Sequence, residues 1–511
     1  RPCYIDGFYG ERRGAYLKTK PIKAFAVNEK EKGRNVVMKK IKKIMAVFLT
    51  MLLVMGMAAT VNAAGPYTIT IDNSIGGHTY TAYQIFKGDL DTNSAILSNI
   101  EWGSGVNGDT LLVALKSDTS IGSGFTDCTT AADVAEVLGD YSNDSDELQA
   151  FAAVASKHVT TESESANTPS EGKYTITGLE AGYYLVRDTG TVSGDDAATR
   201  FILKLTDNVE VTPKSDKPSV EKKVQENDKY GADKEADNPY GTGYNDVADY
   251  DIGSDVPFKL IGTVPDMTGY ETYKYIFHDT LSTGLSLNAE NIKVYLADSK
   301  GAELSGLTPL EATSYTVTTE DLADGCTFEI KIENLKNISG ISSDNFIIVA
   351  YTAKLTSDAV VGLNGNTNAV QLEYSNDPYD TTSTGETVED KVIVFTYKLE
   401  TTKTDKENTE KKLQDAKFVL LSSDGTKVAK VSSTGTFVEW VAVSTVASSG
   451  KPTLDEWETF DEGLRASGDT DKVILTSDSD GLFSVTGLDA GTYKLREIQA
   501  PDGYNLLTED V

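Results

Sequence analysis

Two lysines occur inside short alternating apolar runs, where a charged side chain is unexpected. In SVEKKV, Lys222 shares one face with Val220 and Val224 if the segment is a strand, because strand side chains alternate between two faces. In LETTK, Lys403 shares the face of Leu399 in the same way. If these apolar residues face a core, both lysines are predicted to lie inside it.

Carboxyl and amide side chains follow the same rule in three other predicted strands. In YIFHD, NAVQLEY and YKLRE, the residues Asp279, Asn368 and Glu497 share a face with the apolar residues of their run. One region thus directs a lysine, a carboxylate and an asparagine inward. A later region directs a lysine and a carboxylate inward.

Burial of these groups makes one reaction possible. Desolvation lowers the pKa of a lysine and raises that of a carboxyl group, so a neutral amine can lie beside a protonated acid. Such an amine can attack an asparagine side-chain amide, and proximity supplies most of the acceleration. Ammonia leaves, and a Lys–Asn isopeptide bond joins two strands.

Two other interpretations of these residues remain open. Each charged group can lie on an outward strand face or in a buried salt bridge, because an unpaired buried charge is costly. Within the bond hypothesis, Lys223 and Asn366 are alternatives to Lys222 and Asn368, although strand parity favours the latter pair.

Other chemistry has little support in the sequence. The chain has three histidines, and none has metal-ligand spacing with Cys, Asp or Glu. His278 and Asp279 are adjacent on a predicted strand, so they point to opposite faces and form no catalytic dyad. No Gly-rich phosphate loop follows a strand. We therefore expect no metal, no cofactor and no enzymatic turnover.

The composition indicates a multi-domain β protein. The 511 residues are enough for about three domains, and 43 Gly and 25 Tyr favour strands and turns. A formal net charge of −31 disfavours nucleic acid as a partner. The three cysteines lie far apart, so disulfides are not expected to reinforce the fold.

An internal repeat suggests duplicated domains. The segments 172–188 and 481–497 align without gaps and share Thr-Gly-Leu, Ala-Gly, a Tyr and an Arg before a final carboxylate. Short alternating strands separated by turns predict an all-β fold of tandem immunoglobulin-like, Cna-type β-sandwich domains. The predicted domains are residues 64–211, 212–390 and 391–511.

Local features are expected within these domains. The first contains a small helical insertion at 131–155, followed by hairpins at 173–187 and 199–211. The third carries a polar insertion with a short helix between Trp440 and Asp471.

The start of the chain predicts export. Four lysines within residues 39–43 precede the apolar run 44–59 and the small-residue site Val61-Asn62-Ala63, which is typical of a signal peptide over 38–63. Residues 1–37 are interpreted as a mis-annotated upstream extension, with Met38 as the true start. The C-terminal domain is expected to be truncated, since no closing strand or sorting motif follows Glu509.

Two motifs resemble those of sortase-assembled Gram-positive major pilins. YKLREIQAPDGY at 493–504 is similar to the pilin E-box Y-x-L-x-E-T-x-A-P-x-G-Y and departs from it only at Ile498. LTDNVEVTPK at 205–214 resembles the pilin motif W-x-x-x-V-x-V-Y-P-K, with Leu205 for the Trp and Thr212 for the Tyr. The resemblance covers nearly the whole exported part.

The resemblance implies roles for particular residues. Lys214 would be the sortase acceptor that attacks the thioester-held preceding subunit. Lys222, Asp279 and Asn368 would form the isopeptide site of the middle domain, with Asp279 catalytic. Lys403 and Glu497 would belong to a second site, in a Cna B-type domain whose asparagine lies beyond Val511. In the first domain Asp188 occupies the E-box position, but the opening strand YTITID offers no lysine, so no bond is expected there.

The resemblance also implies partners and location. A shaft pilin is secreted and wall-anchored, joins other copies of itself head to tail through a pilin-specific sortase, carries minor pilins and supports adhesion to a host surface ligand. A minor or tip adhesin pilin is the alternative within this class. A secreted carbohydrate-active enzyme with paired carboxylates is the alternative of another class.

Overall fold

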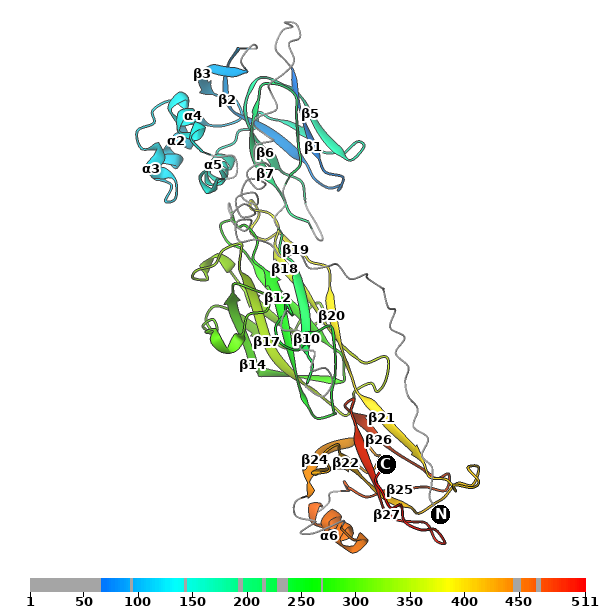
Figure 1. The fold of residues 1–511 in the computed structure, drawn as a ribbon. Coiled ribbons are helices and arrows are strands. Elements are labelled where there is room, and N and C mark those ends of the chain that lie inside the picture. Colours follow the sequence, from blue (N-terminus) through cyan, green and yellow to red (C-terminus); the bar gives the residue numbers. More distant parts are fainter. Residues whose placement is uncertain are drawn as a thin grey trace, which may run out of the picture.

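The computed structural model describes residues 66–91, 95–141, 145–191, 196–213, 217–227, 238–267, 270–443, 452–465 and 470–511. The predicted signal peptide at 38–63 and the segment 1–37 lie outside the described residues, as does Lys214. Strands predominate, and Figure 1 shows three bodies that follow one another in a row. The all-β prediction is confirmed. Within the described part of the chain, no helix is long and apolar enough to span a bilayer.

The first body contains two sheets with a core between them. One sheet has the order β5-β1-β8, and the other has the order β3-β2-β6-β7 with β4 also paired to β2. The bounds are Tyr67–Asp72 (β1), Tyr80–Asp91 (β2), Ile96–Trp102 (β3), Glu164–Ala166 (β4), Lys173–Leu179 (β5), Gly182–Asp188 (β6), Arg200–Leu205 (β7) and Val209–Val211 (β8).

The predicted hairpins of this body are wrong. Strands β5 and β6 belong to different sheets, and so do β7 and β8. The turn after β5 therefore carries the chain across the sandwich, and β5 pairs with β1 instead. Alternation along a strand predicts the strand but not its neighbour, because pairing is decided by the packing of the whole sandwich.

The helical insertion is larger than the segment 131–155. Four helices lie beside the first sandwich: Gly108–Ser117 (α2), Gly122–Phe125 (α3), Ala131–Gly139 (α4) and Asp146–Ser156 (α5). The single predicted helix is two helices with separate starts. Thr130 and Asp133 form a capping box at α4, and the Ser145 side chain accepts a hydrogen bond from the backbone N–H of Leu148 at α5.

The second body is the largest sandwich. Its sheets have the orders β10-β9-β12-β17-β14 and β11-β20-β18-β13-β16-β15, with β19 paired to β18. The strands are Val220–Gln225 (β9), Tyr244–Asn245 (β10), Val247–Asp249 (β11), Asp255–Thr263 (β12), Tyr275–Leu281 (β13), Leu285–Ala297 (β14), Thr316–Thr318 (β15), Phe328–Ile332 (β16), Phe346–Leu355 (β17), Asn366–Ser375 (β18), Thr384–Glu386 (β19) and Asp390–Phe395 (β20). Short 3₁₀ turns lie at Leu304–Gly306 (η1) and Leu335–Asn337 (η2).

The middle sandwich extends beyond the predicted boundary at residue 390. Strand β20 pairs with β18 and β11, and its Val392 and Val394 lie in the core of the second body. The run KVIVF therefore closes this sandwich and does not open the next one.

The third body is a smaller sandwich. Its sheets are the pair β21-β26 and the order β24-β23-β22-β25, with β27 paired to β22. The strands are Tyr397–Thr402 (β21), Lys417–Ser422 (β22), Lys427–Val431 (β23), Phe437–Ala442 (β24), Leu475–Thr476 (β25), Leu482–Leu488 (β26) and Tyr493–Gln499 (β27). The expected helix of the polar insertion is Leu454–Leu464 (α6), whose Trp457 is buried.

Hydrogen bonds join consecutive bodies. The backbone N–H of Ala198 donates to the carbonyl of Asn376, 2.7 Å away, between the first and second bodies. Ile252 donates in the same way to Gly487 at 2.9 Å, between the second and third. Gly487 has φ +92°, and a Cβ there would lie 2.4 Å from the Ile252 side chain. The glycine of the repeated Thr-Gly-Leu thus permits this close approach.

Candidate functional site

The predicted middle-domain residues come from strands on opposite sides of one core. Lys222 lies on β9, and Asp279 and Asn368 lie on the adjacent strands β13 and β18 of the facing sheet. In the register of β13 and β18, Asp279 is opposite Val370, and Asn368 is opposite Leu281. All three polar side chains are buried, so strand parity predicts their direction correctly.

Hydrogen bonds connect the three side chains. The Lys222 amine donates to Asp279 Oδ2 and, at 3.3 Å, to the carbonyl oxygen of Ala369, the residue after Asn368. The Tyr351 hydroxyl donates to Asp279 Oδ2 at 2.9 Å and accepts from Asn368 Nδ2 at 2.8 Å. Amine, acid and amide therefore form one continuous buried network.

Sequence reasoning missed Tyr351. It lies on β17, in the predicted strand NFIIVAYTAKL, and its position alternates inward with Ile347, Val349 and Ala353. Parity could have placed the ring in the core. Nothing local indicates that its hydroxyl connects an acid to an amide.

Burial sets the protonation of the cluster. It lowers the pKa of Lys222 to about 8, because removal from water penalises the ammonium ion more than Asp279 stabilises it. It also raises the pKa of the Asp279 carboxyl, against the stabilising effect of Lys222. Both shifts favour the neutral pair, an amine and a carboxylic acid.

Two oxygen atoms of the cluster are left over. Asp279 Oδ1 and Asn368 Oδ1 are buried and have no hydrogen-bond partner among the described residues. Buried acceptors without a donor are costly, and protonation of Asp279 would add one donor to the cluster.

The alternatives Lys223 and Asn366 lie elsewhere. Lys223 points to the other face of β9, and its amine donates to Asp246 Oδ1 at 2.6 Å. Asn366 is buried, but its amide bonds to the backbone of Val360 and Val394. Its role in the structure is to hold a turn against β20.

The third body holds a similar pair. Lys403 Nζ lies 2.5 Å from Glu497 Oε1, and both side chains are buried. Glu497 Oε2 also accepts from the backbone N–H of Leu507 at 2.8 Å. The structure thus brings together the two residues predicted for a second site.

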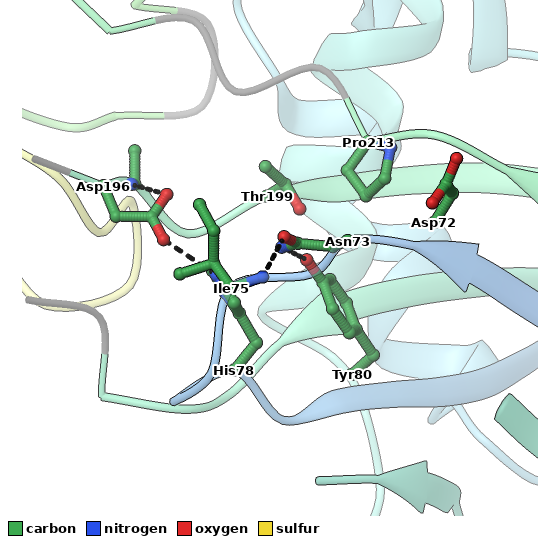
Figure 2. Close-up of a pocket in the computed structure, with 9 residues that line it drawn as sticks. Asp72, Asn73, Ile75, His78, Tyr80, Asp196, Thr199 and Pro213 are labelled. Atoms are coloured by element: carbon green, nitrogen blue, oxygen red, sulfur yellow. Dashed lines mark hydrogen bonds and ion pairs between the residues drawn. The ribbon is translucent and has the colours of Figure 1, made fainter. Parts of the chain in front are cut away.

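In the first body, a histidine contacts the E-box-position carboxylate. His78 Nδ1 lies 2.5 Å from Asp188 Oδ2, and Nε2 lies 2.8 Å from Asp196 Oδ2. His78 and Asp196 line a pocket of about 100 Å³ with Asn73, Tyr80 and Pro213, as Figure 2 shows. Hydrogen bonds to Asp188 and Asp196 raise the pKa of His78 to about 9, against the effect of burial.

This histidine predicts a pH-dependent stability. Because the folded pKa exceeds the unfolded value of about 6.5, the stabilisation is complete below pH 6.5 and is lost as pH rises through about 9. The shift corresponds to on the order of 3 kcal/mol. Hydrogen-exchange mass spectrometry of β6 peptides should show faster opening at pH 9 than at pH 6.5, after correction for intrinsic exchange.

His78→Gln should abolish the difference in opening between pH 6.5 and pH 9, since glutamine cannot carry a positive charge. His158→Gln is the matched control, because the ring of His158 lies in the same body and is 3.0 Å from the Thr110 hydroxyl, a neutral group. An unchanged pH dependence in His78→Gln would contradict the assignment.

The pilin-like motif at 205–214 is described only in part. Its Val209 and Val211 lie on β8, which pairs in parallel with β1, and Leu205 is buried at the Trp position. Pro213 lines the pocket of Figure 2. The following Lys214 lies outside the described residues.

Comparisons with known proteins give a family match for the C-terminal part of the chain. Residues 462–511 match the family SpaA, described as a prealbumin-like fold domain. The chain is 25% identical over 263 residues to the trypsin-resistant surface T6 protein of Streptococcus pyogenes serotype M6. That alignment covers 50% of the chain and 41% of the T6 protein, so it spans less than half of that relative's length.

Two solved structures to which the chain is similar are those of pilins. The T6 backbone pilin of Streptococcus pyogenes is 19% identical with a TM-score of 0.47, over 88% of this chain and 80% of that chain. The major pilin SpaD of Corynebacterium diphtheriae is 18% identical with a TM-score of 0.42, over 88% and 91%. Residues 462–511 are thereby identified as a SpaA-type prealbumin-like fold domain, in a chain that is similar to Gram-positive backbone pilins.

Proposed function

We propose that this chain is a structural shaft subunit of a cell-surface pilus, cross-linked internally by a Lys222–Asn368 isopeptide bond. The observation that carries the proposal is the buried network of Lys222, Asp279, Tyr351 and Asn368. A buried lysine–carboxyl pair is often no more stabilising than apolar residues of the same volume. The isopeptide reaction therefore gives a reason for the presence of this pair.

The reaction begins with the neutral pair that burial favours. Lys222 Nζ attacks the side-chain carbonyl carbon of Asn368, while the Asp279 acid donates its proton toward Asn368 Oδ1. The carbonyl oxygen is thereby polarised in a site without water, where a hydrogen bond to developing charge is strong. The amine and the amide belong to one buried hydrogen-bonded network of the folded sandwich, which supports a lowered entropic cost for their reaction.

The second step expels ammonia. The C–Nδ2 bond breaks as the carbonyl re-forms and returns its proton to Asp279, and the proton lost from Lys222 Nζ passes through Asp279 to the leaving nitrogen. Tyr351 bridges Asp279 and Asn368 Nδ2, so its hydroxyl can relay that proton once it turns to donate toward the leaving nitrogen. The products are one secondary amide and one ammonia, and Asp279 ends in its starting state. The protein performs this step once and is not an enzyme with turnover.

Tyr351→Phe is expected to slow bond formation without preventing it. Loss of a proton-relay group typically reduces a rate by about 10²-fold or more. The time course of ammonia loss, followed by intact mass after cell-free synthesis, should be delayed in this variant. Tyr275→Phe is the matched control, because the buried Tyr275 hydroxyl bonds to the carbonyl of Thr263, outside the cluster. Equal rates in the two variants would assign Tyr351 a packing role.

The third body is proposed to use the same chemistry. Lys403 and Glu497 supply the amine and the acid, and the buried pair at 2.5 Å supports this assignment.

Polymerisation is the other half of the proposal. Lys214 would attack the thioester that a pilin sortase forms with the preceding subunit, joining copies of the chain head to tail at the cell surface. The match of Val209, Val211 and Pro213 to the pilin motif supports this role for Lys214. Minor pilins and a host surface ligand are the further partners that this function implies. Intact-mass spectrometry of the folded chain tests the internal bond, and a polymerisation assay tests Lys214.

A further inference from the structure

The outer face of the second sandwich carries metal-ligating side chains that the isopeptide chemistry does not use. They are His278 on β13, Glu329 on β16, and Asp324 and Cys326 in the segment between β15 and β16. One donor atom from each of the four lies within 4.8 Å of the others. Three of the donors lie within residues 324–329, and His278 comes from a distant strand, so the spacing along the chain does not show the complete set.

The histidine is the centre of this cluster. Its Nδ1 lies 2.8 Å from Asp324 Oδ2 and 3.4 Å from Glu329 Oε1. On its other side, Nε2 lies 3.3 Å from Glu373 Oε2, from the neighbouring strand β18. Carboxylate oxygens that could ligate a metal therefore surround the imidazole, and the thiol of Cys326 completes the set of ligands.

The backbone holds these donors in place. His278 and Glu329 are directly opposite each other in the register of β13 and β16. Asp324 Oδ1 accepts from the backbone N–H of Cys326 at 3.1 Å, which fixes the turn between them. Thr327 then donates its backbone N–H to the carbonyl of Asp279 at 2.7 Å. A ligand set on paired strands and an anchored turn is preorganised for binding.

Charge also favours a cation at this position. Three carboxylates, Asp324, Glu329 and Glu373, face one imidazole, and Lys274 lies 4.0 Å from Glu373. Carboxylates gathered in this way repel one another, and a divalent ion relieves that repulsion.

We propose that His278, Asp324, Cys326 and Glu329 bind one zinc ion. Zinc takes nitrogen, sulfur and carboxylate ligands in a tetrahedron, whereas calcium and magnesium prefer oxygen alone. Ligand bonds of about 2.0–2.3 Å place tetrahedral donors about 3.3–3.8 Å apart. The most distant donors therefore need to approach one another by about 1 Å, whereas His278 Nδ1 and Asp324 Oδ2, 2.8 Å apart, need to separate slightly. Asp324 is exposed and Cys326 is half-buried, so their side chains have room to do so.

Binding would fasten the segment before β16 to β13. The thiol proton and any proton on His278 pass to solvent, since zinc binds thiolate and neutral imidazole. The clamp lies on the opposite face of β13 from Asp279, so it reinforces the strand that carries this acid without entering the buried cluster.

Calorimetric titration of the purified chain with zinc chloride tests the site, with the protein made without a polyhistidine tag. We expect saturable binding of one ion per chain and no comparable binding of calcium. With cobalt as a spectroscopic probe, a thiolate-to-cobalt charge-transfer band and tetrahedral d–d bands are expected. Removing a direct ligand should weaken zinc binding at least as much as the about 10–100-fold loss caused by removing an outer-shell partner.

Cys326→Ser should lose the charge-transfer band, and Cys128→Ser, in the first body, should keep it. Asp324→Asn is the second variant, because it retains the Oδ1 acceptor that holds the turn and so preserves the fold. If zinc does not bind saturably, or binds unchanged in both Cys326→Ser and Asp324→Asn, the proposal is wrong and the cluster is a network of ion pairs only.

Discussion

The folded chain is expected to weigh about 17 Da less than its sequence predicts, the mass of the ammonia expelled when the buried amine attacks at close range. Asn368→Ala should restore the full sequence mass, because it removes the electrophile and leaves the Lys222–Asp279 pair intact. Tandem mass spectrometry of the wild-type digest should yield one branched peptide that contains Lys222 and Asn368.

Asn366→Ala is the matched control for that variant. Asn366 lies on the same strand and the same face, and it is equally buried, but its amide bonds to Val360 and Val394. The Asn366→Ala variant should keep the mass deficit of about 17 Da, which corresponds to the loss of one ammonia. Asp279→Ala should lose the deficit although both reacting groups remain, which separates the catalyst from the reactants. A wild-type chain with the full mass calculated from its sequence would contradict the proposed bond.

The bond should also account for much of the stability of the middle sandwich. By loop-closure entropy, a tie between residues 222 and 368 is worth roughly 5 kcal/mol. For a sandwich of this size, that corresponds to a fall in Tm of about 10–20 °C in Asn368→Ala. Calorimetry of Asn368→Ala and of Asn366→Ala measures the difference in Tm, since Asn366→Ala loses local hydrogen bonds but keeps the isopeptide bond.

Lys214→Ala is expected to abolish the covalent polymer. Its amine would be the nucleophile for the sortase thioester, and alanine supplies none, so the effect should be complete and not graded. Incubation of chains extended by a C-terminal sorting signal with a pilin sortase, followed by denaturing electrophoresis, should give a high-mass ladder for the wild type and monomer for the variant. The monomer should keep the mass deficit of about 17 Da, because polymerisation and formation of the internal bond are independent reactions.

Lys217→Ala is the control for the acceptor position. Lys217 is a lysine three residues further along the chain, at the start of the segment that leads into β9. Its substitution should leave the ladder intact. A ladder that persists in Lys214→Ala and disappears in Lys217→Ala would move the acceptor to the second lysine.

The inward direction of the key side chains could be predicted from the sequence. Lys222, Asp279 and Asn368 each alternate with apolar residues, and a strand has only two faces. The same parity separates Asp279 from His278, whose ring lies on the outer face of β13. The direction of a side chain is a property of a single strand, so it can be predicted from the local sequence pattern.

The neighbours of those side chains could not be predicted in this way. Tyr351 alternates inward on its own strand, yet its contacts with Asp279 and Asn368 depend on how β17 faces the other sheet. The crossing of β5 and β6 between sheets, and the approach of Cys326 to His278, depend on pairing over the whole sandwich in the same way.

The sequence by itself therefore determined which residues enter a core and which strands carry them, because alternation with period two is a local property of the backbone. Only the tertiary structure decided which of those residues meet. Strand order, register and the packing of two sheets join residues more than a hundred positions apart, as for Lys222 and Asn368, and no local spacing encodes such a contact.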